Sequence, residues 1–213
     1  MTEHLATAPH PDRYHLTIPS DWFELDLRGR VLERRLRHAV MSRAGADPQM
    51  RAQGRRLILD LEAVLRTARR RGVVYAAGML RAFDDDVVSA LMMVSVVHVP
   101  AGEGDVLSQL GRMRADRRGA PDGAWQKISA VDLPHAGPAG RVVGVEVLPV
   151  SDRVSLPYAT MHTAIPIPGT SGAMIITGGS PNIRLTTELH DLFDAITSSF
   201  RFVSSEGSAE IPV

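Results

Sequence analysis

The chain has 213 residues, of which 44% are hydrophobic and 23% charged, and its formal net charge is zero. This composition excludes a disordered chain and is sufficient for one domain with a buried core. The absence of cysteine excludes a disulfide framework, thiolate zinc sites and a cysteine nucleophile.

The start of the chain, "MTEHLATAPHPDRYHLTIP", lacks the basic residues and unbroken apolar run of a signal peptide. No run of 18 apolar residues occurs, so we expect no transmembrane segment and a cytoplasmic protein. Twenty-three arginines against one lysine, Lys127, indicate a GC-rich bacterial genome.

Residues 1–12 contain no periodic pattern and are expected to form a disordered tail. The segment "YHLTIPSDWFELDL" (14–27) predicts two short extended pieces around a turn at residues 19–21. Two strands, or one strand and a bend, both fit this pattern.

Residues 28–71 predict a pair of amphipathic helices. The first begins near Gly29 and ends near "RAGAD". Asp47 is a good N-cap and Pro48 a good first helical residue for the second, which ends at Gly72, a residue suited to the left-handed C-cap conformation.

This helical pair is strongly basic. It holds thirteen arginines and four acidic residues, a net charge of +9, which the rest of the chain balances with −9. The arginines either bind an acidic protein, an anionic membrane or nucleic acid, or form the solvated backs of the helices. No Phe, Tyr or Trp lies in 28–71, which weakens nucleic-acid binding and membrane insertion. An acidic protein partner remains the best candidate, with Arg51, Arg55, Arg66 and Arg69 as candidate binding residues.

The middle of the chain predicts antiparallel strands. "VVYAAGMLRAF" (73–83) and "VVSALMMVSVVHV" (87–99) flank Asp84, Asp85 and Asp86, for which a turn is favoured over a metal site because neighbouring turn residues diverge. A short helix follows from Asp105. Further strands are "WQKISAVDL" (125–133), "RVVGVEVLPV" (141–150) and "SLPYATMHTAI" (155–165), with "PHAGPAG" as a loop.

The glycine-rich stretch "PIPGTSGAMIITGGSPN" (166–182) has two interpretations, a phosphate-binding loop or turns. A phosphate loop needs a strand, a glycine-rich turn and a helix start in direct succession, and its NTPase form needs a lysine. Since a strand follows the first glycines and no lysine is present, we predict a hairpin turn at 168–172 and a connecting loop at "TGGSPN". Neither group matches a G-x-S-x-G nucleophile elbow.

The last helix is predicted from Thr186 or Thr187, as N-cap, to Phe200. Its apolar stripe includes Leu189 and Phe193, and His190, Asp191 and Asp194 are predicted to face solvent. "RFV" continues as an extended segment, and residues 204–213 are expected to form a second disordered tail.

The eight histidines form no H-x-H or H-x-x-x-H pair, so the sequence contains no short histidine motif for metal binding. His98 and His162 lie in predicted strands and would meet only across the sheet. For each, a histidine with ordinary partners is favoured over a ligand. We find no triad and no acid pair, and therefore predict no catalytic, cofactor-binding or metal-binding residues.

The two ends of the chain resemble a known family. "IPSDW" near the start, and "PIPGTSGAMIITGGSPN" followed by "LHDLFDAITSSFRFV", resemble the PsbP-like superfamily of small αβα proteins, which includes Mog-, LpqN- and DcrB-type members. The resemblance covers residues 14–27 and 158–203. It implies an αβα fold whose members mostly act as adaptors or binding modules and share no catalytic residues.

We therefore expect one α+β domain over residues 13–203, with an antiparallel sheet of six or seven strands covered by helices and a basic helical pair at 28–71. The leading hypothesis is a non-catalytic partner-binding or accessory protein without a cofactor. The alternative is a small-molecule or lipid carrier with a pocket between sheet and helices lined by Met79, Met92, Met93 and Met161. A third possibility is an enzyme whose residues assemble only in three dimensions.

Overall fold

The computed structural model describes residues 13–25, 72–83, 86–98, 124–151 and 154–203, together with scattered positions between 37 and 58. The expected helix from Asp105, the two terminal tails and most of the basic helical pair lie outside these described residues. Among the described residues, the protein is mostly β.

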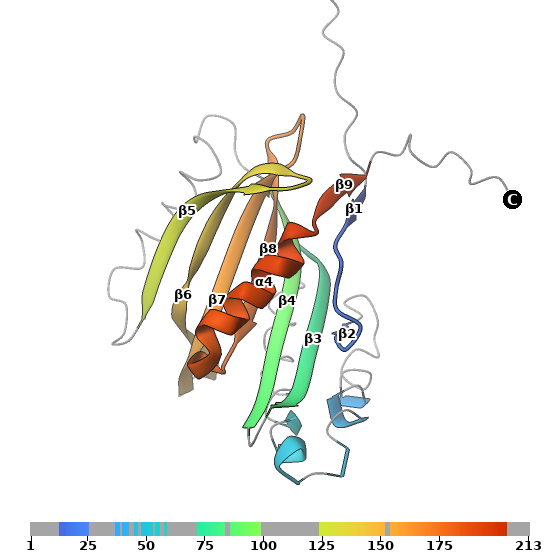
Figure 1. Ribbon diagram of the computed structural model, residues 1–213, viewed down its shortest axis with the longest axis vertical. Helices are drawn as coiled ribbons and strands as arrows, with labels where there is room; N and C mark the ends of the chain where they lie inside the picture. The colour runs from blue at the N-terminus through green and yellow to red at the C-terminus, as the bar shows by residue number, and fades with distance from the viewer. Residues whose placement is uncertain are drawn as a thin grey trace, which may run out of the picture.

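A seven-stranded antiparallel sheet forms the centre of the molecule (Figure 1). In spatial order its strands are β2 (Phe23–Glu24), β3 (Val73–Phe83), β4 (Asp86–His98), β8 (Gly172–Ser180), β7 (Val154–Pro166), β6 (Gly137–Ser151) and β5 (Trp125–Leu133). A separate two-stranded ribbon pairs β1 (Arg13–His15) with β9 (Arg201–Val203). The prediction of a six- or seven-stranded antiparallel sheet is confirmed.

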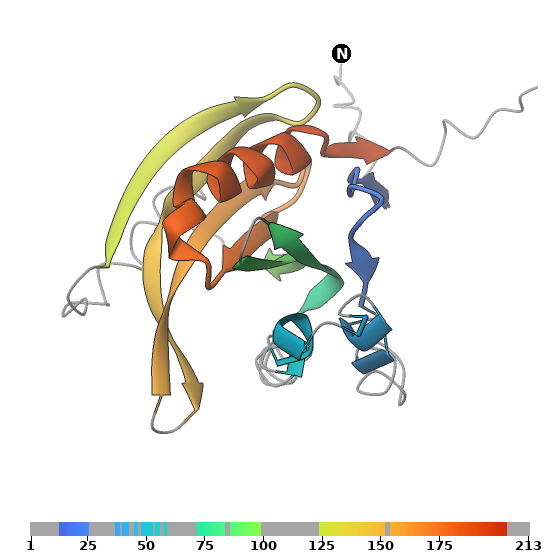
Figure 2. The ribbon, with the colours of Figure 1, turned by 60° about the horizontal axis from the view of Figure 1, so that its bottom comes forward.

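One face of the sheet, here called the helix face, carries α4 (Thr186–Ser198), which follows the 3₁₀ turn η1 (Ile183–Leu185) (Figures 1 and 2). Successive side chains of a strand point to opposite faces of the sheet, and α4 covers the apolar side chains on the helix face. The buried cluster includes Met92, Met161 and Ile176 from the sheet and Leu189 and Phe193 from the helix. This is the larger core of the protein.

The opposite face, here called the outer face, has a second apolar cluster at its β2–β3–β4 side. Val40, Met50 and Ile58, all at helical positions, are buried there against Phe23 and Leu80. The helical residues lie on the side of the sheet away from α4 (Figure 2). Helical residues therefore contact both faces, but only α4 is a long helix among the described parts of the chain.

The strands at 73–83 and 125–133 are confirmed residue for residue, and β4 is displaced by one residue from the predicted range. Phe83 and Asp86 are paired, so β3 and β4 form the predicted hairpin, and Asp84 and Asp85 lie outside the described residues. Of the two alternatives for residues 14–27, the structure has two strands, which do not pair with each other because β1 joins β9 and β2 joins β3.

The predicted loop at "TGGSPN" is wrong for its first four residues, because β8 continues through Gly178 and Gly179 to Ser180. Gly178 lies on the helix face, where a Cβ atom would be 2.5 Å from Cγ of Phe193. The glycine lets the helix approach the strand, which was not visible from the turn-like composition. The predicted loop "PHAGPAG" is likewise shorter, since β6 begins at Gly137, which has a φ of 75°.

Asn182 completes the end of the sheet. Its side-chain amide donates to the Val87 carbonyl (2.8 Å), and its Oδ1 accepts from the Ser89 backbone N–H (2.9 Å). The Ser180 hydroxyl also donates to the Ser89 carbonyl (2.7 Å). These hydrogen bonds satisfy backbone groups of β4 that lie just beyond its last pairs with β8. The segment "SPN" (180–182) therefore has a structural role.

The start of α4 also differs from the prediction. Leu185 occupies the N-cap position and makes no side-chain cap hydrogen bond. The Thr186 hydroxyl donates instead to the Ile183 carbonyl of η1. A 3₁₀ turn thus leads into the helix in place of the expected threonine cap.

The neighbouring glycines of β8 provide a matched test of helix packing. Gly178→Ala is expected to lower the free energy of unfolding by about 1–3 kcal/mol, because its methyl group overlaps the Phe193 ring. Gly179→Ala is the control: no atom lies within 4 Å of its Cβ position, so stability stays equal or rises slightly. Urea unfolding of both variants checks this, and equal stabilities would contradict it.

Candidate functional site

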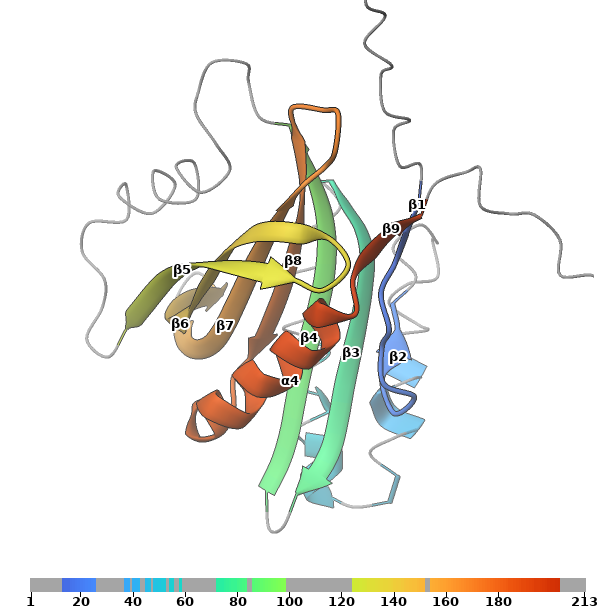
Figure 3. The ribbon, with the colours of Figure 1, turned by 45° about the horizontal axis from the view of Figure 1, so that its top comes forward.

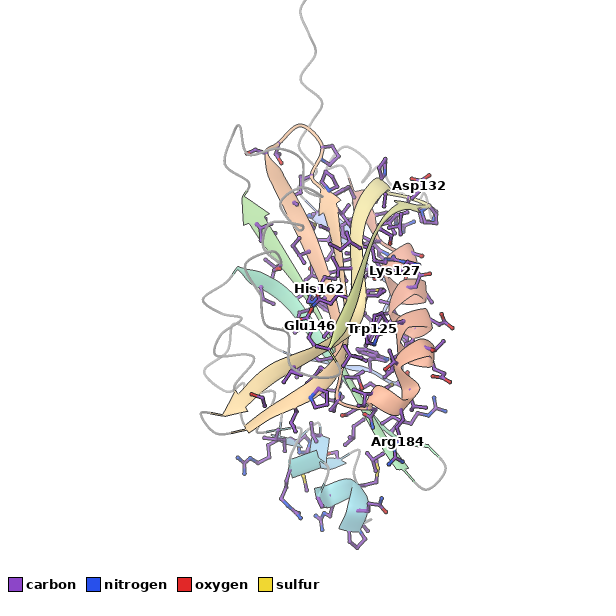
Figure 4. The ribbon with its side chains drawn as sticks, turned by 90° about the vertical axis from the view of Figure 1, so that its left-hand side faces the viewer. Trp125, Lys127, Asp132, Glu146, His162 and Arg184 are labelled. Carbon is purple, nitrogen blue, oxygen red and sulfur yellow. The ribbon has the colours of Figure 1, made fainter. Side chains whose placement is uncertain are left out.

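Four polar side chains meet on the outer face, from four different strands. We call Gln126 of β5, Glu146 of β6, His162 of β7 and Thr177 of β8 the outer-face cluster. Glu146 Oε1 accepts from Gln126 Nε2 (2.9 Å) and lies 3.1 Å from His162 Nε2. His162 Nδ1 lies 3.1 Å from the Thr177 hydroxyl. Figure 4 shows Glu146 and His162 next to each other.

The β-register explains how these residues meet. Glu146 is paired with Tyr158 and His162 with Val142, so the two side chains reach toward each other along the sheet. The pair between them is Gly144 and Thr160, and a Cβ atom on Gly144 would lie 2.0 Å from the Trp125 carbonyl oxygen. Glycine is therefore required here so that β5 can approach closely.

The hydrogen bonds define a chemical order of carboxylate, imidazole and hydroxyl. With Glu146 ionised and His162 neutral, Nε2–H donates to the carboxylate and Nδ1 accepts from Thr177. Glu146 is only 6% exposed, whereas the His162 side chain is 24% exposed. The cluster thus joins a buried carboxylate to an imidazole that reaches solvent.

Thr160 lies under this cluster and is 3% exposed. Within the described parts of the chain, its hydroxyl has no hydrogen-bond partner. Thr160 pairs with Gly179 of the neighbouring strand β8. A Cβ atom built on Gly179 would have no other atom within 4 Å. A buried hydroxyl beside open space is the kind of position that a water molecule or a ligand group completes.

The sequence analysis missed this constellation. The backbone of His98 pairs with Gly172 and that of His162 with Thr177, so the two residues lie at different levels of β8. His162 has the ordinary partners that were favoured for it. Glu146 was not singled out, because no local spacing links it to a histidine sixteen residues later. An acidic residue within an otherwise apolar strand was the one available signal.

His190 also differs from its prediction, because it is only partly exposed to solvent. Its Nε2 lies 3.1 Å from the Thr160 carbonyl oxygen, and its ring meets that of Trp125 edge to face at 6.1 Å. Burial lowers the pKa of His190, and the backbone carbonyls of Thr160 and Gly144 oppose this only in part. The ring thus fills the space between α4 and β5.

A buried arginine links α4 to the sheet. Arg141 Nη1 forms an ion pair with Asp194, and its Nε donates to the Thr163 hydroxyl (3.2 Å). Arg141 is 9% exposed, whereas the Asp194 side chain is about half exposed. The solvent-facing prediction for Asp194 therefore holds, but its carboxylate also neutralises an arginine in the core.

The candidate arginines divide into two groups. Arg51 and Arg55 are exposed at helical positions one turn apart. Within the described residues, neither has an ion-pair partner. Arg66 and Arg69 lie outside the described residues.

The four methionines proposed to line one pocket do not share a face, and that part of the carrier hypothesis is wrong. Met79, Met92 and Met161 are buried in the core under α4. Met93 faces the other way and packs against the cluster formed with Val40 and Met50. Residues 92 and 93 are neighbours in a strand, so their side chains must point to opposite faces.

Within the part of the chain that the structure describes, no three His, Asp or Glu residues are grouped to hold a metal ion. The same residues include no helix long and apolar enough to cross a membrane.

Comparison with known proteins gives a structural match. No family model matches the sequence, and no curated protein matches it. The structure is similar to a solved one. This is LpqN, described as involved in cell envelope biogenesis of Mycobacterium tuberculosis, with a TM-score of 0.44 and 13% sequence identity. The match covers 88% of this chain and 82% of LpqN.

The lowered pKa of His190 predicts a pH dependence of stability. Because the folded state disfavours protonation, the unfolded state binds more protons, and stability falls as the pH drops below the ordinary histidine value of 6.5. The variant His190→Gln lacks the pH-dependent contribution of His190 to the free energy of unfolding. The difference in unfolding free energy between the wild type and this variant should therefore shrink as the pH falls. Denaturant titrations from pH 8 to pH 5 measure it. His135→Gln, an exposed turn residue, is the control, and a slope unchanged in His190→Gln would refute the assignment.

Removing His162 is expected to leave the Glu146 carboxylate buried without one of its partners. His162→Ala should lower the free energy of unfolding by about 1–3 kcal/mol, and Glu146→Gln by less because an amide costs less to bury. Chemical denaturation at neutral pH distinguishes the two. If Glu146→Gln is the more damaging, the carboxylate is held mainly by other groups.

Proposed function

We propose that the protein is a non-catalytic accessory protein that binds an acidic protein partner through the basic surface around Arg51 and Arg55. The observation that carries this proposal is the way the helical residues dock. Met50 and Ile58 are buried against the sheet, whereas Arg51 and Arg55 are exposed. The segment is thus held to the sheet by Met50 and Ile58 while Arg51 and Arg55 stay exposed beside them.

The chemistry of arginine favours a carboxylate-bearing partner. A guanidinium group binds a carboxylate through two parallel hydrogen bonds, and two arginines one turn apart offer two such sites. Neither guanidinium forms an ion pair with another of the residues that the structure describes. Long-range attraction to an acidic surface would also raise the association rate.

The resemblance of residues 14–27 and 158–203 to the PsbP-like superfamily agrees with this proposal. We infer from this resemblance that the chain is a member of the superfamily. Most members of the superfamily act as adaptors or binding modules. The seven-stranded sheet with a C-terminal helix is compatible with such a protein. Fold analogy identifies no partner, and the proposal therefore depends on the arginines.

The test is charge reversal at the two described arginines. The double variant Arg51→Glu/Arg55→Glu should bind a partner captured from native extract at least tenfold more weakly, and added salt should weaken wild-type binding. Adding Arg66→Glu and Arg69→Glu tests the whole candidate set. Arg184→Glu, an exposed arginine of η1, is the control for charge alone.

Calorimetric titration measures the affinities, and circular dichroism confirms folding. Undiminished binding of the double variant would overturn the proposal. If the double variant and Arg184→Glu lose the same amount of binding affinity, the binding is a non-specific charge effect and the proposed role of Arg51 and Arg55 is wrong.

One observation favours a second function, the binding of a small polar molecule at the outer-face cluster. It is the buried Thr160 hydroxyl, which has no hydrogen-bond partner among the described residues, beside the open space above Gly179. We propose this as a narrower form of the carrier hypothesis, with a different site from the methionines.

Thr160→Val separates an occupied site from an empty one. If the hydroxyl has no partner, the isosteric valine should raise the free energy of unfolding by about 1 kcal/mol. If a molecule or water binds it, the variant should be less stable, and native mass spectrometry of the wild type should distinguish a retained molecule from the bare chain. A stabilised variant together with a bare wild-type mass would refute small-molecule binding.

A further inference from the structure

The two edges of the seven-stranded sheet are very different. At one edge, β2 contains two residues, the short type of edge strand that gives little template for pairing. At the other edge, β5 contains nine residues and pairs with β6 without a register shift (Figure 3). Among the described strands, none pairs with the outer side of β5.

The side chains of β5 are not those of a protected edge. The strand has no proline and no bulge, and its first four residues are all exposed. Trp125 and Ile128 are each 48% exposed and lie on opposite faces of the sheet. Lys127 is the one charged residue near the centre of the strand. Unpaired backbone N–H and C=O groups between two exposed apolar side chains favour the addition of another strand.

We propose that β5 pairs antiparallel with β5 of a second copy of this chain, about a two-fold axis at Ser129. The two-fold axis of such an antiparallel edge contact is perpendicular to the sheet, so the same face of both sheets points the same way. Side chains that lie opposite each other must therefore be on the same face, which means that an even-numbered residue pairs with an even-numbered one and an odd-numbered residue with an odd-numbered one. The two sheets then continue as one, with both α4 helices on the same side.

The side chains are compatible with this register. With Ser129 opposite itself, Trp125 meets Leu133 and Ile128 meets Ala130 of the second copy, so apolar residues lie opposite apolar residues. Gln126 meets Asp132, an amide opposite a carboxylate. Each contact occurs twice, and no like charges face each other. A shift by two positions to a centre at Ala130 would place Ile128 against Asp132.

Electrostatics also permits self-association. The formal net charge of the chain is zero, so two copies do not repel each other overall. Within β5, the one lysine and the one aspartate cancel. The basic residues Arg51 and Arg55 belong to the segment packed at the β2–β3–β4 side of the sheet, far along the strand order from β5. The dimer is therefore independent of the proposed partner surface.

The absence of cysteine makes the register directly measurable, because any introduced cysteine is the only one. In Ser129→Cys, the two Cα atoms would be about 4.5–5.5 Å apart across the axis, within the range for a disulfide. In Lys127→Cys, the matched control on the same face, the two positions are offset by four residues, about 13 Å, and cannot be bridged.

The full-length protein is expected to sediment as a dimer in the micromolar range. Ser129→Cys should form a disulfide-linked dimer under mild oxidation at least tenfold faster than Lys127→Cys. Ile128→Lys should raise the dimer dissociation constant at least tenfold while circular dichroism shows an unchanged fold. A monomer at all concentrations overturns the proposal. Equal oxidation of the two cysteine variants, or an Ile128→Lys dimer as stable as the wild type, also overturns it.

Discussion

The packing of Phe193 on Gly178 determines how close α4 lies to the sheet. Because the glycine has no side chain, the aromatic ring rests directly on the backbone of a central strand. The ring is completely buried, and the apolar residues of β4, β7 and β8 surround it. The other α4 contacts, the Arg141–Asp194 pair and the His190 ring against Trp125, form at the distance that this contact sets.

The two faces of the sheet also differ in chemistry. The helix face is filled mainly by apolar side chains, among them Met161, Ile176 and Phe193, and its buried Arg141 is paired with Asp194. The outer face has its apolar cluster where helical residues cover β3 and β4, and it carries the polar outer-face cluster at β5 to β8. The polar outer-face cluster therefore lies on the opposite side of the sheet from the main core.

Local sequence patterns were sufficient for the strands and for α4, because alternation and helical spacing are properties of neighbouring residues. They failed where a residue's role depends on a distant partner. Gly178 and Gly179 have the composition of a loop, yet the strand passes through them because Phe193, fifteen residues later, needs the space. The outer-face cluster depends on the register of four strands, and no single segment contains its chemistry. Thr186 lost its expected capping role for a related reason, since η1 sets the entry into the helix.

The pairing of β1 with β9 brings the two ends of the described chain together. Arg13 lies opposite Val203, so the first and last strands are neighbours although 190 positions separate them. A short linker could therefore join these two strands into a continuous hairpin without distorting the sheet. The chain could then be opened at the exposed turn between β5 and β6, which makes this architecture suitable for circular permutation.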